Sequence, residues 1–182
     1  MDLAVVVVAP LSEDGRERSR ARLVGSALHD RFVVETIDLV AEDFTPAMSR
    51  TERLRYPGPD PIVDPLVEVH AGLVRRAAIL VFVFPTPWWT PPAVLKAWLE
   101  RVFVPGVAFE LDDRNRLRPR LHSLRAVAGV TTHLHPDAIG DAGDGARRML
   151  LRTMRLNAPR RVRTGWMVDP TDEALTRWFA RL

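Results

Sequence analysis

The sequence predicts an α/β fold in which helices cover both faces of a five-stranded parallel sheet. Residues 78–84, AILVFVF, form a continuous apolar run that is too short for a buried helix and ends at Pro85. A run of this kind is typical of a strand in the middle of a parallel sheet. Similar runs alternate with segments whose apolar residues recur at helical spacing, which predicts a doubly wound sheet with strand order 2-1-3-4-5.

This alternation is regular along all 182 residues, and neither a linker nor a repeat interrupts it. We therefore expect one domain, residues 1–182. The predicted strands comprise residues 3–9, 32–39, 78–84, 125–132 and 162–168. The predicted helices comprise residues 19–30, 62–76, 91–104, 138–156 and 171–182, the last one opened by Thr171 as its cap. Residues 44–61 are rich in proline, and we expect them to be irregular.

The third predicted strand is followed by an aromatic, proline-rich loop, residues 85–92. Prolines fix φ in this loop, and Trp88 and Trp89 give it a stiff aromatic rim that suits a flat ligand. We expect Thr90 to cap the next helix and Pro91 to occupy its first position. The alternative is that both tryptophans pack against an edge of the core.

The composition excludes several kinds of chemistry. The chain has no cysteine, so disulfides, thiolate catalysis, zinc–thiolate centres and iron–sulfur clusters are excluded, and redox chemistry would require a bound cofactor. No apolar run approaches the ~18 residues of a membrane span, and the N-terminus enters a strand directly. We therefore expect a cytoplasmic protein without membrane insertion. The net charge is +3, and acidic residues interrupt the arginine clusters, which favours solvated helix surfaces over nucleic-acid binding.

One longer pattern is specific. Around the aromatic loop the chain carries F-P-x-x-W, a proline, L-K-x-W-x-E-R-V and then G-x-A-F, in the residues Phe84, Pro85, Trp88, Pro92, Leu95, Lys96, Trp98, Glu100, Arg101, Val102, Gly106, Ala108 and Phe109. This pattern resembles the NAD(P)H:quinone oxidoreductase branch of the flavodoxin-like proteins. The resemblance extends upstream through residues 38–56 and downstream through residues 117–121 and 130–132, where it fits the fourth strand of that family, and it covers roughly residues 1–135.

The resemblance implies a flavodoxin-like fold, a bound FMN or FAD, NAD(P)H as co-substrate, a quinone or similar flat molecule as electron acceptor, and a homodimer. Little chain follows Thr132 to build a separate adenosine site, which favours FMN over FAD. Two alternatives stay open. One is a regulatory or ancillary subunit of the same fold with weak or no flavin binding, and the other is a flavoenzyme dedicated to one biosynthetic intermediate.

In the expected topology the first, third and fourth strands end at one edge of the sheet, so three loops should converge on one ligand. The first loop leads into a helix whose free amides and dipole favour a phosphate. By resemblance, the FMN phosphate would lie here, bound by Ser12, Arg18 and Ser19. Glu13 and Asp14 in the same loop would repel a phosphate unless they turn outward. An exposed loop without a ligand is the alternative.

The other two loops would contact the flavin ring. By resemblance, the third-strand loop contributes Pro85, Thr86, Pro87, Trp88 and Trp89, and the fourth-strand loop contributes Thr131, Thr132 and His133. His133 and His135 are the candidate catalytic residues, as proton donors to the reduced substrate. The alternatives are histidines without a catalytic task, or a metal pair, for which no third ligand has a recognisable spacing. Leu134 stands where the family has glycine, so either the loop takes another path or flavin binding is altered.

Overall fold

The computed structural model of the chain describes residues 1–13, 15–133 and 145–181. Within these residues, five parallel strands form a sheet in the order β2-β1-β3-β6-β7. When only these five strands are counted along the chain, the order is 2-1-3-4-5, which confirms the prediction. The strands are β1 (Asp2–Val8), β2 (Phe32–Asp38), β3 (Ala77–Pro85), β6 (Ala126–Thr132) and β7 (Arg163–Val168).

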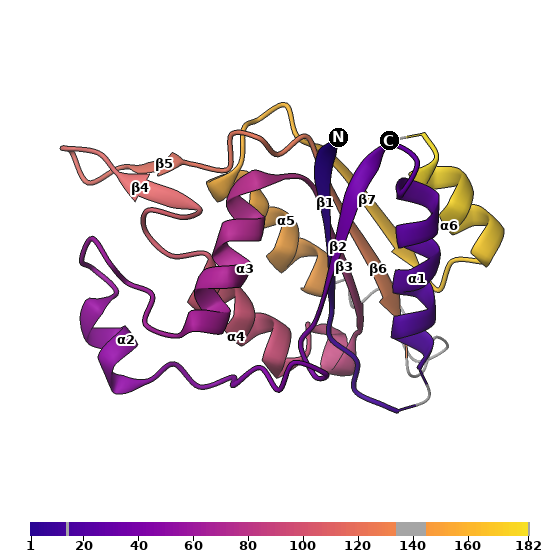
Figure 1. Cartoon of the computed structure of the whole chain (residues 1–182), viewed down its shortest axis with the longest axis horizontal. Helices are drawn as coiled ribbons and strands as arrows, with labels where there is room; N and C mark the ends of the chain where they lie inside the picture. Colours follow the sequence, from indigo (N-terminus) through magenta and orange to yellow (C-terminus); the bar gives the residue numbers. More distant parts are fainter. Residues whose placement is uncertain (14, 134–144, 182) are drawn as a thin grey trace.

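Helices cover both faces of this sheet (Figure 1). One face carries α1 (Arg16–Leu28) and α6 (Asp172–Phe179). The other face carries α3 (Pro65–Arg76), α4 (Ala93–Val102) and α5 (Gly145–Asn157). Every residue of β3 is buried between these layers, as its unbroken apolar run predicts. In the described ranges, no helix is long and apolar enough to cross a lipid bilayer.

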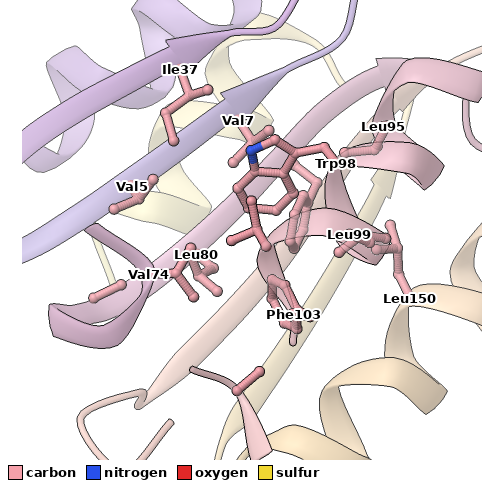
Figure 2. Packing of buried hydrophobic residues seen from close by; sticks show 14 of the residues in the cluster. Val5, Val7, Ile37, Val74, Leu80, Leu95, Trp98, Leu99, Phe103 and Leu150 are labelled. Atoms are coloured by element: carbon pink, nitrogen blue, oxygen red, sulfur yellow. The ribbon is translucent and has the colours of Figure 1, made fainter. Parts of the chain in front are cut away.

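The core on the α3–α4–α5 face surrounds Trp98 of α4 (Figure 2). The Trp98 ring is fully buried, and it meets the rings of Phe82 and Phe103 edge-on, with centroids 6.2 and 5.8 Å away. Aromatic pairs of this geometry contribute about 0.5–1.5 kcal/mol beyond the area they bury. Trp98, the second tryptophan of the sequence pattern, is therefore a residue of the core.

Two short elements lie outside these predictions. Residues 44–61 contain α2 (Arg50–Arg55), which begins with a capping box in which the Ser49 hydroxyl accepts from the Glu52 amide and the Glu52 carboxylate accepts from the Ser49 amide. The expectation of an irregular stretch was wrong at this point, because the Ser-x-x-Glu pattern supplies a helix start. β4 (Phe109–Leu111) and β5 (Leu117–Pro119) form an antiparallel hairpin, so the segment that begins at residue 117 is not part of the fourth parallel strand.

α1, α3 and α4 begin at residues other than those predicted. α3 begins at Pro65 and not at residue 62, because the Asp64 carboxylate caps it by accepting from the Leu66 amide. α1 starts at Arg16, because Gly15 adopts φ 74° and acts as its N-cap. α4 starts at Ala93 with Pro92 as its cap, so the prediction of Thr90 and Pro91 was wrong. The reason is that Pro92 disfavours helical geometry at Pro91. The prediction for the last helix is confirmed, since the Thr171 hydroxyl accepts a hydrogen bond from the Ala174 amide.

Candidate functional site

The carboxyl edge of the sheet brings two of the predicted loops together. Pro85, the last residue of β3, pairs with Thr132, the last residue of β6. Beyond this pair, the Thr86 amide donates to the Thr132 carbonyl at 3.0 Å, which extends the contact into the loop. The first turn of α1 reaches the same edge, where the Thr132 hydroxyl donates to Glu17. We use the name carboxyl edge for the region where β3 ends at Pro85, β6 ends at Thr132 and α1 begins.

The aromatic loop forms a tight turn, η1 (Pro87–Trp89), at the carboxyl edge. Two hydrogen bonds hold it, from the Trp89 amide to the Thr86 carbonyl at 3.2 Å and from the Thr90 amide to the Pro87 carbonyl at 3.0 Å. Trp88 is 86% exposed and Trp89 is half-buried, so the alternative in which both tryptophans pack in the core is wrong. A large exposed aromatic side chain next to a sheet edge can stack against a flat ligand.

The backbone of this turn is strained. Trp88 and Trp89 have φ values of 51° and 59°, in the left-handed region that bulky residues rarely adopt. Asp169, which follows β7, has φ 41°. Among the described residues five non-glycine residues have positive φ, and these three lie at the carboxyl ends of β3 and β7. Backbone strain of about 1–3 kcal/mol per residue persists where the surroundings enforce it, and it occurs often at binding sites.

The start of α5 helps to enforce this conformation. A side chain at position 145 would bring its Cβ within 2.8 Å of the Trp89 carbonyl oxygen. Gly145 therefore allows the helix to approach the backbone of the turn closely. The aromatic turn is supported on one side by β3 and on the other by α5.

Four polar residues form a connected group beneath the turn, which we call the Thr132 cluster: Glu17, Thr86, Thr132 and His133. The Thr132 hydroxyl donates to Glu17 Oε1 at 2.7 Å. The Thr86 hydroxyl lies 3.3 Å from the Thr132 carbonyl oxygen and 3.2 Å from His133 Nδ1. Glu17 is only 3% exposed, and its other oxygen, Oε2, has no hydrogen-bond partner among the described residues.

His133 is oriented from two directions. Its amide donates to Asp169 Oδ2 at 3.1 Å, and its Nδ1 meets the Thr86 hydroxyl. The hydroxyl has a single proton, which it donates to the Thr132 carbonyl, so Nδ1 carries a proton and donates to the hydroxyl oxygen. When the imidazole is protonated, Nε2 carries a second proton that is available to another molecule. The geometry is thus compatible with a proton donor at Nε2. The rival candidate, His135, lies outside the described residues, as does Leu134.

The residues predicted to bind a phosphate have other contacts. Arg18 Nε donates to Asp38 Oδ2 at 2.5 Å, and the two residues line a surface cavity of about 600 Å³ between α1 and β2. Hydrogen bonding and the charge of Asp38 raise the pKa of Arg18. Ser19 is exposed and accepts a hydrogen bond from Arg22 at 2.9 Å. Ser12 is exposed in the loop before α1. Phosphate binding by Ser12, Arg18 and Ser19 stays a prediction.

The two threonines at the end of β6 differ in their surroundings. Both are buried. The Thr131 hydroxyl contacts the Met167 carbonyl of β7 at 3.3 Å, whereas the Thr132 hydroxyl contacts Glu17 of α1. Successive strand residues point to opposite faces, which separates the two hydroxyls. Of the pair, Thr132 alone belongs to the cluster beneath the aromatic turn.

A second polar group lies on the α3–α4–α5 side and centres on Arg101 of α4. The guanidinium is 5% exposed and binds Glu52 Oε1 at 2.8–2.9 Å, Asp64 Oδ2 at 2.7 Å and the Thr45 carbonyl at 2.6 Å. It also lies over the Phe44 ring, 5.0 Å from the centroid. We call Arg101, Glu52, Asp64 and Thr45 the Arg101 cluster. It fastens residues 44–64 to α4, so this arginine of the sequence pattern is structural.

The charge of Arg101 also affects its two carboxylates. Burial by itself raises the pKa of Glu52, but hydrogen bonds from Ser49 and Arg101 lower it further than burial raises it. Burial likewise raises the pKa of Asp64, and the hydrogen bonds from Arg101 and the Leu66 amide outweigh it. Both carboxyl groups therefore titrate below their ordinary range in the folded protein.

His70, which is 1% exposed, has a fully defined set of partners. Trp98 Nε1 donates to His70 Nδ1 at 3.2 Å, and because an indole N–H can only donate, Nδ1 must be unprotonated. The ring proton is then on Nε2, which lies 2.8 Å from Glu42 Oε2. The other oxygen of Glu42 accepts from the Asp38 amide at 3.0 Å. This chain of contacts connects the core to the end of β2.

Sequence reasoning missed two residues at the carboxyl edge, Glu17 and Asp169. A helix predicted to start at Ser19 places Glu17 in a loop, whereas the cap at Gly15 places it in the first turn. Gly15 followed by an acidic residue two positions later was the available signal. Asp169 lies between the last predicted strand and the predicted cap at Thr171, and no role in a ligand site was predicted for it. Among the described residues, no three His, Asp or Glu side chains are grouped as a metal site would require.

Comparison with known proteins agrees with this architecture. Residues 1–158 match the family described as having a flavodoxin-like fold, and the chain belongs to this family. It is 28% identical over 113 residues to NAD(P)H dehydrogenase [quinone] 1 of Cavia porcellus, a match that covers 58% of this chain and 41% of that enzyme. The chain therefore spans less than half of the length of this relative.

Two solved structures show the same fold at low sequence identity. NAD(P)H:quinone oxidoreductase from Methanothermobacter marburgensis superposes with a TM-score of 0.72 at 20% identity, covering 100% of this chain and 97% of the other. An FMN-dependent NADH-azoreductase from Bacillus anthracis, solved in complex with FMN, superposes with a TM-score of 0.69 at 12% identity, covering 100% and 97%. At these identities the likeness concerns the fold.

Proposed function

We propose that this protein is an NAD(P)H-dependent oxidoreductase that holds a flavin at the carboxyl edge and passes two electrons to a quinone or a similar flat acceptor. The observation that carries the proposal is the exposed Trp88 on a strained turn directly above the Thr132 cluster. In a chain of the flavodoxin-like family, that edge is where an open α/β sheet binds ligands. The names of the relatives support the reaction class.

The residues of the carboxyl edge have distinct tasks in this proposal. A flavin, when bound, supplies the redox chemistry, because its ring accepts a hydride from a reduced nicotinamide and passes two electrons to an acceptor. Trp88, with Trp89 beside it, provides the aromatic surface for a flat ring. Thr86 and Thr132 hold the turn in place through the hydrogen bonds between the two loops. Gly145 allows α5 to support it from behind.

His133 is the proposed proton donor to the reduced acceptor. Thr86 and Asp169 hold its ring and its amide, so the imidazole keeps one orientation without an obligatory partner at Nε2 among the described residues. A positioned acid of this kind accelerates a reaction by about 10²–10⁴-fold. Thr86 acts here as a positioning residue, because its hydroxyl oxygen accepts a hydrogen bond from Nδ1 and leaves Nε2 for the acceptor.

We also propose that the protein works as a homodimer in the cytoplasm, in line with the family resemblance of the sequence. Light scattering after size-exclusion chromatography tests the first part, since a dimer has twice the 20.5 kDa mass of the chain. A monomer at micromolar concentration would contradict it.

The central test is spectroscopic and kinetic. The purified protein is incubated with FMN, FAD or riboflavin, freed of excess flavin and examined for the absorption bands of oxidised flavin. Oxidation of NADH and NADPH is then followed with and without a benzoquinone. We expect bound flavin and quinone-dependent oxidation of at least one nicotinamide. A protein that retains no flavin and oxidises neither nicotinamide contradicts the proposal.

One observation favours a second candidate function. The buried carboxylate of Glu17 stands at the start of α1, where a phosphate group was predicted. A negative charge at this point suits a regulatory or ancillary subunit of the same fold with weak or no flavin binding. The same spectroscopic test separates the two, because such a subunit would remain colourless with every flavin.

A further inference from the structure

Glu17 is an unusual residue for the position it occupies. It lies in the first turn of α1, a helix of 13 residues that begins at Gly15 without a side-chain cap. The amide groups of such a helix end attract anions, which is why a phosphate is expected there. Glu17 is itself an anion, and it is nearly fully buried at this end of the helix. The chain thus supplies its own negative charge.

The Glu17 carboxylate is directed toward the carboxyl edge. Thr132 Oγ1, at the end of β6, donates to Oε1 at 2.7 Å. Oε2 is buried and has no hydrogen-bond partner among the described residues. A buried carboxylate oxygen without a donor is costly, by about 1–3 kcal/mol or more. This oxygen is therefore an acceptor for which the described part of the chain provides no donor.

In the part of the chain that the structure describes, Arg18 and Arg20 form no ion pair with Glu17, although the charge of Arg18 acts on Glu17 through space. Arg18 is bound to Asp38, and Arg20 donates to the Pro170 carbonyl. Arg16 is exposed, and Glu13 in the preceding loop is an exposed carboxylate. A phosphate at the start of α1 would meet the negative charge of Glu17, to which Thr132 donates at Oε1 and no described residue donates at Oε2. The aromatic turn fits a flat ring, whereas the start of α1 does not fit a phosphate.

We infer that Glu17 is a specificity-determining residue that selects a flat ligand with an uncharged, hydroxyl-bearing tail over the phosphorylated form of the same ligand. A hydroxyl group can donate to Oε2, while an ionised phosphate offers only acceptors and repels the carboxylate. For a flavin, this means that riboflavin binds at least as tightly as FMN. The inference rests on the proposed flavin binding and specifies which flavin the pocket accepts.

The test compares riboflavin and FMN by quenching of their fluorescence in titrations with the wild-type protein, Glu17→Gln and Glu13→Gln. The two variants each remove one carboxylate from the same segment, but Glu13 is exposed. Two unit charges about 6–12 Å apart at an effective dielectric constant of about 20 interact strongly enough to change affinity by about 10- to 100-fold. We expect Glu17→Gln to strengthen FMN binding by this factor and to change riboflavin binding less than about threefold.

Glu13→Gln should leave both affinities within about twofold of wild type, because exposed charges are screened by solvent. The inference is overturned if the wild-type protein binds FMN more tightly than riboflavin, or if Glu17→Gln leaves the ratio of the two affinities unchanged. If circular dichroism shows that Glu17→Gln does not fold, the preference of the wild-type protein for riboflavin or FMN alone tests the inference. Binding of FMN in preference to riboflavin contradicts only this inference, whereas binding of neither flavin contradicts the proposed function as well.

Discussion

Two buried glutamates in this protein have nearly the same exposure and very different surroundings. Glu52 is 5% exposed, and both of its oxygens are used: Oε1 by Arg101 and Oε2 by the Ser49 amide. Glu17 is 3% exposed, yet only Oε1 has a partner among the described residues. The first carboxylate belongs to a complete network, and the second belongs to one that a donor from another molecule could complete.

This difference distinguishes polar groups that stabilise the fold from polar groups that could bind a ligand. In the Arg101 cluster and around His70, cations, amides and ring nitrogens match the acceptors. The carboxyl edge instead combines the unmatched oxygen of Glu17 with the strained backbone of Trp88 and Trp89 and the exposed indole of Trp88. Buried polar groups are normally satisfied, and an exception calls for an explanation by strain, catalysis or a ligand. Four buried side-chain atoms among the described residues lack a partner: Glu17 Oε2, Arg20 Nε, Asn157 Oδ1 and Trp166 Nε1. Of these, the Glu17 oxygen belongs to the Thr132 cluster beneath the aromatic turn, at the edge where the sequence predicts a ligand.

Breaking the complete network should have the largest effect on stability. Arg101→Met leaves Glu52 and Asp64 without their cation, and loss of one partner from a buried ion pair typically costs about 3–5 kcal/mol. The free energy of unfolding in guanidinium chloride measures this loss. The matched control is Lys96→Met on the same helix, because Lys96 forms an exposed pair with Glu100 and such pairs contribute about 0–1 kcal/mol. Equal losses in the two variants would contradict the structural role of Arg101.

Within the incomplete cluster, His133 is the residue whose replacement should affect the rate most. His133→Asn should slow reoxidation of the bound flavin by the acceptor by about 10²–10⁴-fold, because it removes the acid, while reduction by NAD(P)H changes much less. Stopped-flow measurement of the two half-reactions separates these effects. His122→Asn, at an exposed histidine, is the control, and His135→Asn tests the rival donor. If neither His133→Asn nor His135→Asn slows reoxidation, this loop supplies no acid.

Trp88 should affect binding without affecting stability. Its side chain is almost entirely exposed, so Trp88→Ala should change the free energy of unfolding by less than about 0.5 kcal/mol. Flavin or acceptor affinity should fall by about 1–3 kcal/mol, the contribution of one aromatic stack. Trp98→Phe is the opposite case, because it removes the donor to His70 and should cost about 1–3 kcal/mol of stability. An unstable Trp88→Ala protein with unchanged affinity would assign Trp88 to the fold.

The sequence predicted the sheet well because β3 and the strands beside it are buried on both faces and therefore consist of unbroken apolar runs. The order of the strands followed from the alternation with helices. Helix starts were less accurate, since they depend on single residues such as Gly15 and on the effect of Pro92 on Pro91. α2 was missed because six residues are too few to show an apolar period, although its capping box was present.

For the candidate site, the sequence identified the loops but not the pairings within them. Trp88 was predicted from the aromatic loop and from the family resemblance, and Thr86 and Thr132 were named because the resemblance implies them. The contact between Glu17 and Thr132 joins residues 115 positions apart, and no local pattern indicates such a contact. Similarly, the pairing of Arg18 with Asp38 depends on the approach of α1 to β2 in three dimensions.

The last prediction concerns acid, which should weaken the Arg101 cluster in a defined direction. Glu52 and Asp64 have lowered pKa values in the folded protein, although burial by itself raises them, because Ser49, Arg101 and neighbouring amides stabilise the charged forms. Their contribution to stability is therefore complete above the ordinary carboxyl range and is lost as the pH falls through the folded pKa values.

Unfolding in urea between about pH 7 and pH 3 tests this sign. The free energy of unfolding of the wild-type protein should fall over the lower part of this range. Arg101→Met lacks the cation that stabilises the two carboxylates, so its free energy of unfolding should fall less. In that variant, burial without Arg101 disfavours the charged carboxylates, so protonation becomes less costly. The difference in unfolding free energy between the two proteins should consequently narrow as the pH falls. A constant difference across the range would mean that Arg101 stabilises the fold by packing and not through the charges of Glu52 and Asp64.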